Sequence, residues 1–367
     1  MKIARIRSEI VTLPADEPLA DGPMTKGATR PIVVVKIWTA DGVEGVGVSF
    51  FGAAMTNTLK QAVDDLGKLI VGDDPRLTER IADKLRQAAG NSAGPGGVFT
   101  LALSAIDTAL WDIKAKALGL PVAHLLGGHR DTVPAYASGA LMRHFTLKEV
   151  EAGARKLVER GWKSMKTQLA LPGKTSPEIE IERMKVVRAA IGPDIQLMCD
   201  INQRWTVYQA IDIGRRIEEV NLHWLEDVTT CDDYDGLARV THALKTPVAG
   251  GEYVYGIAPF RQMLESRSVD IVMIDLLRAG GITQWMKIAA MAEAFNMPVV
   301  SHLIPEVHVH LIAAIPNGEI VEYMPWTRPL FAECPLPEKS MMTVPSVPGL
   351  GLRFTKEIEA KLDAGRT

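Results

Sequence analysis

The stretch of sequence that decides the fold reads IQLMCDIN at 195–202, LHWLEDV at 222–228 and PVAGGEYVYG at 247–256. In each segment a short apolar run leads into an acidic residue, and these three acids are Asp200, Glu226 and Glu252. They are evenly spaced, and each gap fits one strand, one helix and two loops, which is the repeating unit of a parallel barrel. We therefore predict that the three carboxylates follow neighbouring strands and converge on one point.

The expected convergence of three carboxylates indicates a bound cation. Like charges that are held close together raise each other's pKa, so such a cluster needs a positive partner. Oxygen-only ligand sets favour hard ions, and Mg²⁺ is the ion that we expect at Asp200, Glu226 and Glu252.

The composition is that of a globular chain with a large interior. Its 367 residues exceed what a single core usually supports, so we expect one large domain and a smaller one. The hydrophobic fraction of 47% is enough to fill both. A net charge of −3 gives no reason to expect a nucleic acid as partner.

Cysteine usage and the N-terminus favour a cytoplasmic protein. The three cysteines are odd in number and unclustered, which is typical of a reducing compartment rather than of a disulfide framework. The N-terminal segment MKIARIRSEIVTL alternates apolar and polar residues and lacks the apolar core of a signal peptide. No apolar run approaches membrane-spanning length, so we expect no membrane partner.

The chain divides into three regions. Residues 1–130 read as an α+β capping domain, in which a long loop at 14–31, rich in proline, glycine and alanine, separates strand-like runs. Residues 131–325 alternate strand-like and helix-like segments and are the predicted catalytic domain. Residues 326–367 are broken by prolines, and we expect them to pack back on the capping domain.

The middle region carries eight short apolar runs with helical stretches between them. The strand candidates are 133–136, 164–167, 195–199, 223–225, 248–249, 271–274, 299–300 and 320–323. Eight such units predict an α/β fold of the (β/α)8-type, or modified TIM, barrel.

Seven of these eight strands end in an ionisable side chain. In a barrel such residues meet in one pocket at the C-terminal ends of the strands. A single strand-end acid or lysine is usually a solvated or capping group, but seven in succession indicate an active site. The residues are Lys166 (followed by Gln168), Asp200, Glu226, Glu252, Asp275, His302 and Glu322.

Several segments resemble motifs of the enolase superfamily and, within it, of the mandelate racemase (mandelate racemase/muconate lactonizing enzyme) subgroup, over almost the whole chain. Asp275 and His302 have the spacing of that subgroup's Asp–His pair. The segments are AIDTALWDIKAKALGLPVAHLLGG at 105–128, DINQRW at 200–205, WLED at 224–227, GGE at 250–252 and SHLIPEVHVHLIAA at 301–314.

This resemblance implies Mg²⁺-dependent removal of the proton next to a substrate carboxylate, which gives an enediolate. In that chemistry His302 is the base or acid, and Asp275 fixes its tautomer. Lys166 binds the carboxylate and raises the positive potential, and Glu322 hydrogen-bonds with the carboxylate. Relatives commonly form dimers to octamers, so a homo-oligomer is expected.

The resemblance also suggests residues that contact the substrate. The 14–31 loop is similar to the family's closing loop, and within it Met24 and Lys26 are candidates. Asn202 is a candidate for binding the metal or orienting a ligand, and Gln168 is a further candidate at the end of the second strand.

One departure from the family pattern decides the expected reaction. The family's second strand usually ends in Lys-X-Lys, whereas this chain has Lys166-Thr167-Gln168. Glutamine cannot take up a proton, which leaves His302 as the one clear base and favours a one-base reaction. We expect a lyase that dehydrates an acid sugar (an aldonate or aldarate) to a 2-keto-3-deoxy acid. A cycloisomerase, a racemase or epimerase with Lys166 as second base, and a non-catalytic relative remain open.

Overall fold

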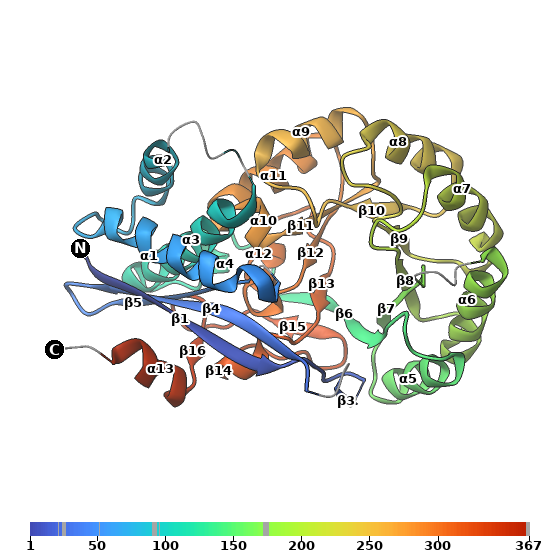
Figure 1. The fold of residues 1–367 in the computed structure, drawn as a ribbon, viewed down its shortest axis with the longest axis horizontal. Coiled ribbons are helices and arrows are strands. Elements are labelled where there is room, and N and C mark those ends of the chain that lie inside the picture. Colours follow the sequence, from blue (N-terminus) through green and yellow to red (C-terminus); the bar gives the residue numbers. More distant parts are fainter. Residues whose placement is uncertain are drawn as a thin grey trace.

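The molecule consists of an N-terminal α+β unit that lies beside a ring of parallel strands and outer helices (Figure 1). The computed structural model describes residues 1–20, 22–23, 27–50, 52–89, 94, 96–171 and 176–364. This arrangement confirms the predicted fold class, a (β/α)8-type barrel with a separate N-terminal domain. Where one domain ends and the next begins stays a prediction.

The barrel is built from eight parallel strands. Seven neighbouring pairs run from β12 through β11, β10, β9, β8, β7 and β6 to β13. The strands are β6 (Thr132–Leu141), β7 (Ser164–Gln168), β8 (Gln196–Asp200), β9 (Trp224–Glu226), β10 (Val248–Gly250), β11 (Ile271–Asp275), β12 (Val299–His302) and β13 (Val321–Tyr323). The ring closes where the backbone of Glu319 donates to Val299 O at 2.9 Å.

Helices form the outer layer of the barrel. They are α5 (Leu147–Glu159), α6 (Pro177–Ile191), α7 (Val207–Arg216), α8 (Tyr234–Ala243), α9 (Ile257–Glu265), α10 (Leu276–Ala279), α11 (Ile282–Ala294) and α12 (Pro305–Ala314). Local sequence sets several starts. Thr146 and Glu149 form a capping box at α5, and Thr206 and Gln209 form another at α7. No helix in the described part of the chain combines the length and apolarity needed to cross a membrane.

The interior of the barrel is a packed core rather than a pore. Side chains from different strands fill it. Among them, the rings of Tyr136 and Trp224 pack edge to face, with their centroids 5.5 Å apart. This packing closes the ring below the strand ends, so that a pocket can form only at the rim.

The N-terminal domain is a three-stranded antiparallel sheet covered by helices. Its elements are β1 (Ile3–Pro14), β4 (Thr29–Thr39), β5 (Glu44–Ser49), α1 (Thr56–Ile70), α2 (Thr78–Ala88), α3 (Gly97–Leu118) and α4 (Val122–Leu125). Helix α3 ends at Gly119, which adopts the left-handed conformation (φ 69°) that glycine accommodates easily.

Helix α3 ties the N-terminal domain to the barrel. Its backbone touches β5 so closely that a Cβ at Gly45 or Gly47 would lie 2.1 Å from a carbonyl oxygen of α3. On another side, Asp107 accepts hydrogen bonds from the backbone and hydroxyl of Thr283 at the start of α11. Asp112 accepts from the backbone of Val46 in β5 and of Leu350 in the C-terminal segment.

The C-terminal segment contacts both halves of the molecule. Its elements are β14 (Phe331–Glu333), β15 (Met341–Thr343), β16 (Arg353–Phe354) and α13 (Lys356–Asp363). Strand β15 pairs with barrel strand β6. Helix α13 lies against β1, and its Glu359 forms an ion pair with Lys36 of the neighbouring strand β4.

The expected loop at 14–31 is partly sheet, which corrects the sequence-based prediction. Strands β1 and β4 pair as far as Pro14 and Thr29, and a small hairpin of β2 (Asp16–Glu17) and β3 (Gly22–Pro23) lies between them. The hairpin docks through Glu17, which is 1% exposed and accepts hydrogen bonds from Trp326 Nε1 at 2.9 and 3.0 Å. Arg30 pairs with Glu17 at 3.4 Å and lies over the Trp326 ring.

The buried carboxyl of Glu17 predicts a pH-dependent contribution to stability. Burial, opposed by Trp326 and Arg30, raises the pKa of Glu17 from 4.5 to about 7. The folded state therefore binds this proton more tightly than the unfolded state, so stability falls as pH rises from about 4.5 to about 7. Glutamine does not titrate, so we expect the free energy of unfolding to fall with pH by roughly 2 to 3 kcal/mol less in Glu17→Gln than in the wild-type protein. Urea unfolding of both proteins at pH 5 and pH 8 measures this difference. If both lose the same free energy between the two pH values, the assignment to Glu17 is wrong.

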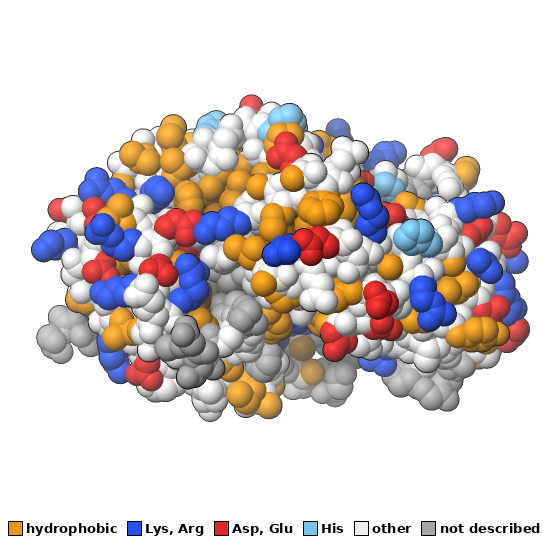
Figure 2. Space-filling view, turned by 90° about the horizontal axis from the view of Figure 1, so that it is seen from above, with side chains coloured by type: hydrophobic (Ala, Val, Ile, Leu, Met, Phe, Trp, Pro, Cys, Tyr) orange, Lys and Arg blue, Asp and Glu red, His pale blue; other side chains and the backbone are white. Residues whose placement is uncertain are grey.

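Basic and acidic side chains are interspersed on the face that Figure 2 shows, with hydrophobic side chains between them. Among the described residues of this face, the view shows no broad field of one charge.

Candidate active site

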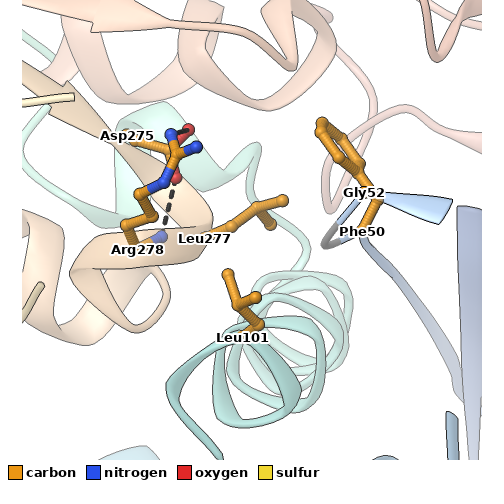
Figure 3. A pocket seen from close by; sticks show the side chains of 6 residues that line it. All are labelled: Phe50, Gly52, Leu101, Asp275, Leu277 and Arg278. Atoms are coloured by element: carbon orange, nitrogen blue, oxygen red, sulfur yellow. Dashed lines mark hydrogen bonds and ion pairs between the residues drawn. The ribbon is translucent and has the colours of Figure 1, made fainter. Parts of the chain in front are cut away.

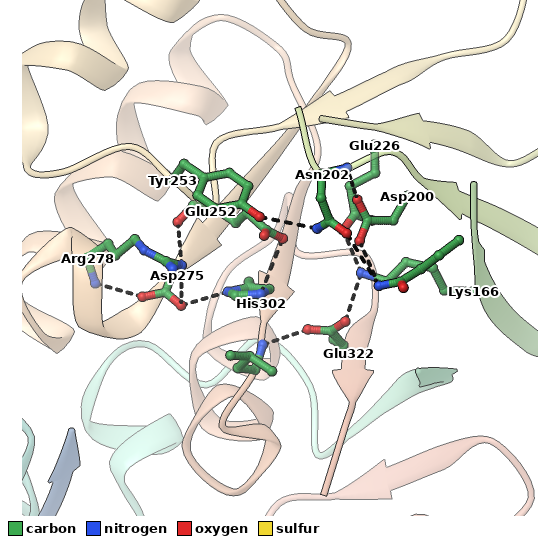
Figure 4. Close-up of polar contacts among 12 residues, drawn as sticks. Lys166, Asp200, Asn202, Glu226, Glu252, Tyr253, Asp275, Arg278, His302 and Glu322 are labelled. Carbon is green, nitrogen blue, oxygen red and sulfur yellow. Dashed lines mark hydrogen bonds and ion pairs between the residues drawn. The ribbon is translucent and has the colours of Figure 1, made fainter. Parts of the chain in front are cut away.

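The strand ends bring the predicted polar residues to one rim of the barrel (Figure 4). The sheet register sets neighbours side by side. Gln168 of β7 pairs with Asp200 of β8, and Asp200 pairs in turn with Glu226 of β9. On the other side of the ring, Asp275 of β11 pairs with His302 of β12.

A cavity of about 400 Å³ opens at this rim. Seven of the predicted site residues line it, namely Lys166, Gln168, Asp200, Asn202, Glu252, His302 and Glu322. Glu226 lies fully buried beneath it, and Asp275 stands behind His302. Met24 and Lys26 lie outside the described residues.

Three carboxylates form a tight group in the cavity floor. Single oxygens of Asp200, Glu226 and Asp227 lie within 4.8 Å of one another, and all three residues are buried. Burial, followed by neighbouring carboxylates, raises the pKa of Asp227 well above its ordinary value, and burial also raises the pKa of Glu226 although Lys166 opposes it. Asp227 Oδ2 is buried and has no hydrogen-bond partner among the described residues. An orphaned carboxylate oxygen in such a group suits an oxygen-binding cation.

Glu252, the third predicted metal ligand, stands apart from this group. Its Oε2 lies 3.2 Å from His302 Nε2. Burial raises the pKa of Glu252 well above its ordinary value, and the charges of Asp227 and Asp200 raise it further, so these acids share one electrostatic environment. The structure thus brings Asp227, which the sequence analysis did not assign to the metal site, into the tight group and leaves the role of Glu252 as a prediction.

Lys166 is a buried cation with two acidic partners. Its ammonium forms ion pairs with Glu226 and, at 2.8 Å, with Glu322. Burial alone would lower the pKa of Lys166, but the two carboxylates raise it well above its ordinary value. Burial would likewise raise the pKa of Glu322, yet Lys166 and then His302 lower it to about 2. Both ion pairs therefore favour the ammonium form of Lys166.

His302 and Asp275 form the predicted pair. His302 Nδ1 lies 2.7 Å from Asp275 Oδ2, and Asp275 Oδ1 also accepts from the backbone N–H of Arg278 at 2.6 Å. Although burial opposes it, the Arg278 guanidinium and then His302 lower the pKa of Asp275 to about 2. The contact with Asp275 occupies Nδ1, which leaves Nε2, 3.2 Å from Glu252 Oε2, as the ring nitrogen on the cavity side.

Gln168 lies across the ring from His302, on β7, with β6 and β13 between them on the shorter path. Its Nε2 donates to Asp200 Oδ2 at 3.3 Å and to Asn202 Oδ1 at 3.4 Å. Asn202 Nδ2 donates in turn to the hydroxyl of Tyr253 at 3.2 Å. This side of the cavity therefore presents neutral amides where the other side presents an imidazole.

Sequence reasoning missed three cations that line the cavity, Arg143, Arg204 and Arg278. Arg143 Nη2 donates to Asn202 Oδ1. The rule that found the other site residues also applies to Arg143, because β6 continues to Leu141 and Arg143 lies two residues beyond that end. The sequence-based strand ended at Tyr136, so its true end was not inspected.

A second cavity of about 320 Å³ adjoins the first (Figure 3). It shares Phe50 and Arg278 with the first cavity and lies between the N-terminal domain and the barrel. Its remaining walls are Gly52, Leu101, Asp275 and Leu277.

Barrel, acid group and covering N-terminal domain together are the architecture of enolase-like proteins. Residues 149–358 match the family model described as Enolase C-terminal domain-like. Residues 8–127 match the model described as Mandelate racemase / muconate lactonizing enzyme, N-terminal domain. The chain belongs to the mandelate racemase/muconate lactonizing enzyme family, which confirms the resemblance seen in the sequence.

Individual relatives cover nearly the whole chain. L-talarate/galactarate dehydratase of Salmonella typhimurium is 33% identical over 97% of this chain and 90% of its own length. The 3,6-anhydro-alpha-L-galactonate cycloisomerase of Streptomyces coelicolor is 30% identical over 87% of this chain and 88% of its own length. The crystal structure of L-talarate dehydratase from Polaromonas sp. JS666, complexed with Mg and L-glucarate, is also similar. It superposes with a TM-score of 0.89, at 33% identity and over 98% of this chain and 96% of the other.

Proposed function

We propose that the protein is a Mg²⁺-dependent lyase that dehydrates an acid sugar to a 2-keto-3-deoxy acid. The observation that carries the proposal is the contrast between the two sides of the cavity. His302 is held by Asp275 at 2.7 Å, whereas Gln168 and the paired Lys166 offer no base. Relatives named as acid-sugar dehydratases support the substrate class.

The proposed metal ligands are Asp200, Glu226 and Glu252, with Asp227 beside them. When bound, Mg²⁺ supplies a Lewis acid that stabilises negative charge on the substrate's carboxylate oxygens. Lys166 adds positive charge at the same carboxylate, and Glu322 holds Lys166 in place. These groups lower the free energy of an anion that water would stabilise much less.

His302 then performs both proton transfers. Its Nε2 removes the proton on the carbon next to the carboxylate, and Asp275 stabilises the imidazolium that forms. The imidazolium returns a proton to the β-hydroxyl, which leaves as water. The resulting enol tautomerises to the 2-keto-3-deoxy acid. One base on one face of the carbon is enough for this sequence of steps.

A cycloisomerase is the second candidate, and the relative from Streptomyces coelicolor favours it. Incubation with Mg²⁺ and a panel of acid sugars and their lactones in D₂O separates the two. Dehydration yields a keto-deoxy acid, which semicarbazide derivatisation and NMR detect. Ring opening or closure without loss of water would support the cycloisomerase instead. If Mg²⁺ promotes no turnover of any acid sugar or lactone in the panel, the proposal is wrong.

Replacing Gln168 by lysine tests why this side of the cavity carries no base. We expect Gln168→Lys to introduce exchange of the substrate α-proton with D₂O, because an amine on β7 can reach the side of the carbon that His302 does not serve. The control Gln168→Met should show no such exchange. Proton NMR of recovered substrate measures the effect, and absence of exchange in the lysine variant would contradict the assignment of position 168.

Location and assembly complete the proposal. We expect a cytoplasmic homo-oligomer that acts on a small carboxylate and binds neither nucleic acid nor membrane. Light scattering coupled to gel filtration tests the oligomeric state.

A further inference from the structure

Arg143 is a buried cation that lines the cavity without an acidic partner. Arg143 is only 8% exposed. Its Nη2 donates to Asn202 Oδ1 and, at 3.5 Å, to the backbone oxygen of Asp200. Both acceptors are neutral, and Arg143 Nε is buried with no hydrogen-bond partner among the described residues.

The other cations of the cavity differ from Arg143 in this respect. Lys166 is paired with Glu226 and Glu322, and Arg278 lies 3.5 Å from Asp275. Arg204 is exposed at the rim, where water solvates its charge. In the described part of the chain, Arg143 is thus the one buried cation of this cavity that has no ion pair.

A buried guanidinium without an anion is unfavourable, because neutral acceptors satisfy its hydrogen bonds but not its charge. Asp200 is the acid with the largest electrostatic effect on Arg143. It is also a proposed Mg²⁺ ligand, so its charge serves the ion once the metal is bound. The planar fork of a guanidinium fits a carboxylate through two parallel hydrogen bonds.

The turn that carries Arg143 is held in place before any ligand arrives. Arg183, which is 4% exposed, donates to Met142 O at 2.5 Å and to Phe145 O at 2.8 Å, on either side of Arg143. A group fixed in this way loses little conformational freedom when it binds.

We propose that Arg143 binds a second carboxylate, at the far end of the acid sugar, and thereby selects diacids over monoacids. The inference rests on the proposed function, which assigns the reacting carboxylate to Mg²⁺ and Lys166. Arg143 is anchored instead at Asn202 and at the backbone oxygen of Asp200, the last residue of β8. Among the described residues no hydrogen bond or ion pair joins it to Lys166 or Glu322, so we place it at a different part of the substrate.

Equilibrium binding tests this without turnover. The protein carries His302→Asn to block proton removal, is loaded with Mg²⁺, and is titrated calorimetrically with matched pairs: galactarate and galactonate, glucarate and gluconate. Each pair differs only in the terminal group. We expect the best diacid to bind at least about 30-fold more tightly than its monoacid, the effect of a charge-assisted hydrogen-bonded pair.

Adding Arg143→Gln should abolish this preference while leaving the Kd of the monoacid within about 3-fold, and Arg143→Lys should retain part of it. Retained monoacid binding shows that the variant is folded. The control Arg204→Gln should shift diacid and monoacid alike, since an exposed charge acts on both through the general potential.

Two results would overturn the inference. One is equal affinity of the His302→Asn protein for diacid and monoacid. The other is an equal loss of affinity for diacid and monoacid when Arg143→Gln is added, which would place Arg143 at the carboxylate that both ligands share. Turnover assays with His302 intact keep the two proposals apart. Dehydration of diacids and monoacids with equal kcat/KM, unchanged by Arg143→Gln, would refute the inference alone. Arg143-dependent diacid binding without turnover of either acid would refute the proposed function alone.

Discussion

Replacing His302 by asparagine is expected to lower kcat by about 10³- to 10⁴-fold, the usual contribution of a positioned general base and acid. The imidazole performs both proton transfers in the proposed reaction, and neither Lys166 nor Gln168 can take its place. Asparagine keeps a polar group of similar size at the end of β12, so the change removes the basic nitrogen with little effect on packing. Steady-state kinetics on the best acid sugar gives the value.

Two further measurements separate loss of the base from loss of structure. Mg²⁺ affinity should stay nearly unchanged in His302→Asn, because the proposed ligands are carboxylates. The variant His242→Asn serves as a matched control, since His242 is exposed on α8 and its ring nitrogen hydrogen-bonds the backbone of its own helix. A substantial residual rate in His302→Asn would show that another group removes the proton.

Replacing Asp200 by asparagine is expected to weaken Mg²⁺ binding by at least about 100-fold, because even outer partners of metal ligands contribute 10- to 100-fold. Asp200 lies in the tight carboxylate group and is oriented by Asn202 N–H, which donates to its Oδ1 at 2.7 Å. Asparagine keeps this hydrogen bond and removes the negative charge. Calorimetric titration of the metal-free protein with Mg²⁺, without substrate, measures the loss.

The same titration decides which acid is the third ligand. If Glu252 turns toward the ion, Glu252→Gln weakens Mg²⁺ binding more than Asp227→Asn does. The opposite order would replace Glu252 by Asp227 in the ligand set. Asp212→Asn, in an exposed ion pair on α7, should leave the affinity unchanged. An unaltered affinity in Asp200→Asn would remove the whole carboxylate group from the metal site.

The barrel was predictable because its strands are buried on both faces. Parallel strands of this kind read as short apolar runs, and all eight runs are strands in the structure. The hairpin of β2 and β3 was not predictable in this way. Its strands are two residues long, and its anchor is the contact of Glu17 with Trp326, far along the chain.

The site was predictable as far as strand ends could be located. Seven strands ended within a residue or two of the predicted position, and each delivered its polar group to the rim. Strand β6 continues beyond Tyr136, where the predicted strand ended, to Leu141, and Arg143 was missed for that reason. Side-chain direction was a second limit. For neighbouring acids such as Glu226 and Asp227, the sequence does not show which side chain points toward an ion.

The central helix α3 has a consequence for how such a molecule can be altered. It is buried over most of its length between β5, α11 and the C-terminal segment, and its acids Asp107 and Asp112 join these three parts. The N-terminal domain and the barrel thus depend on the same helix. A chimera that exchanges the N-terminal domain to change substrate specificity must therefore include α3 with both acids, because otherwise the barrel loses packing contacts together with the domain that was replaced.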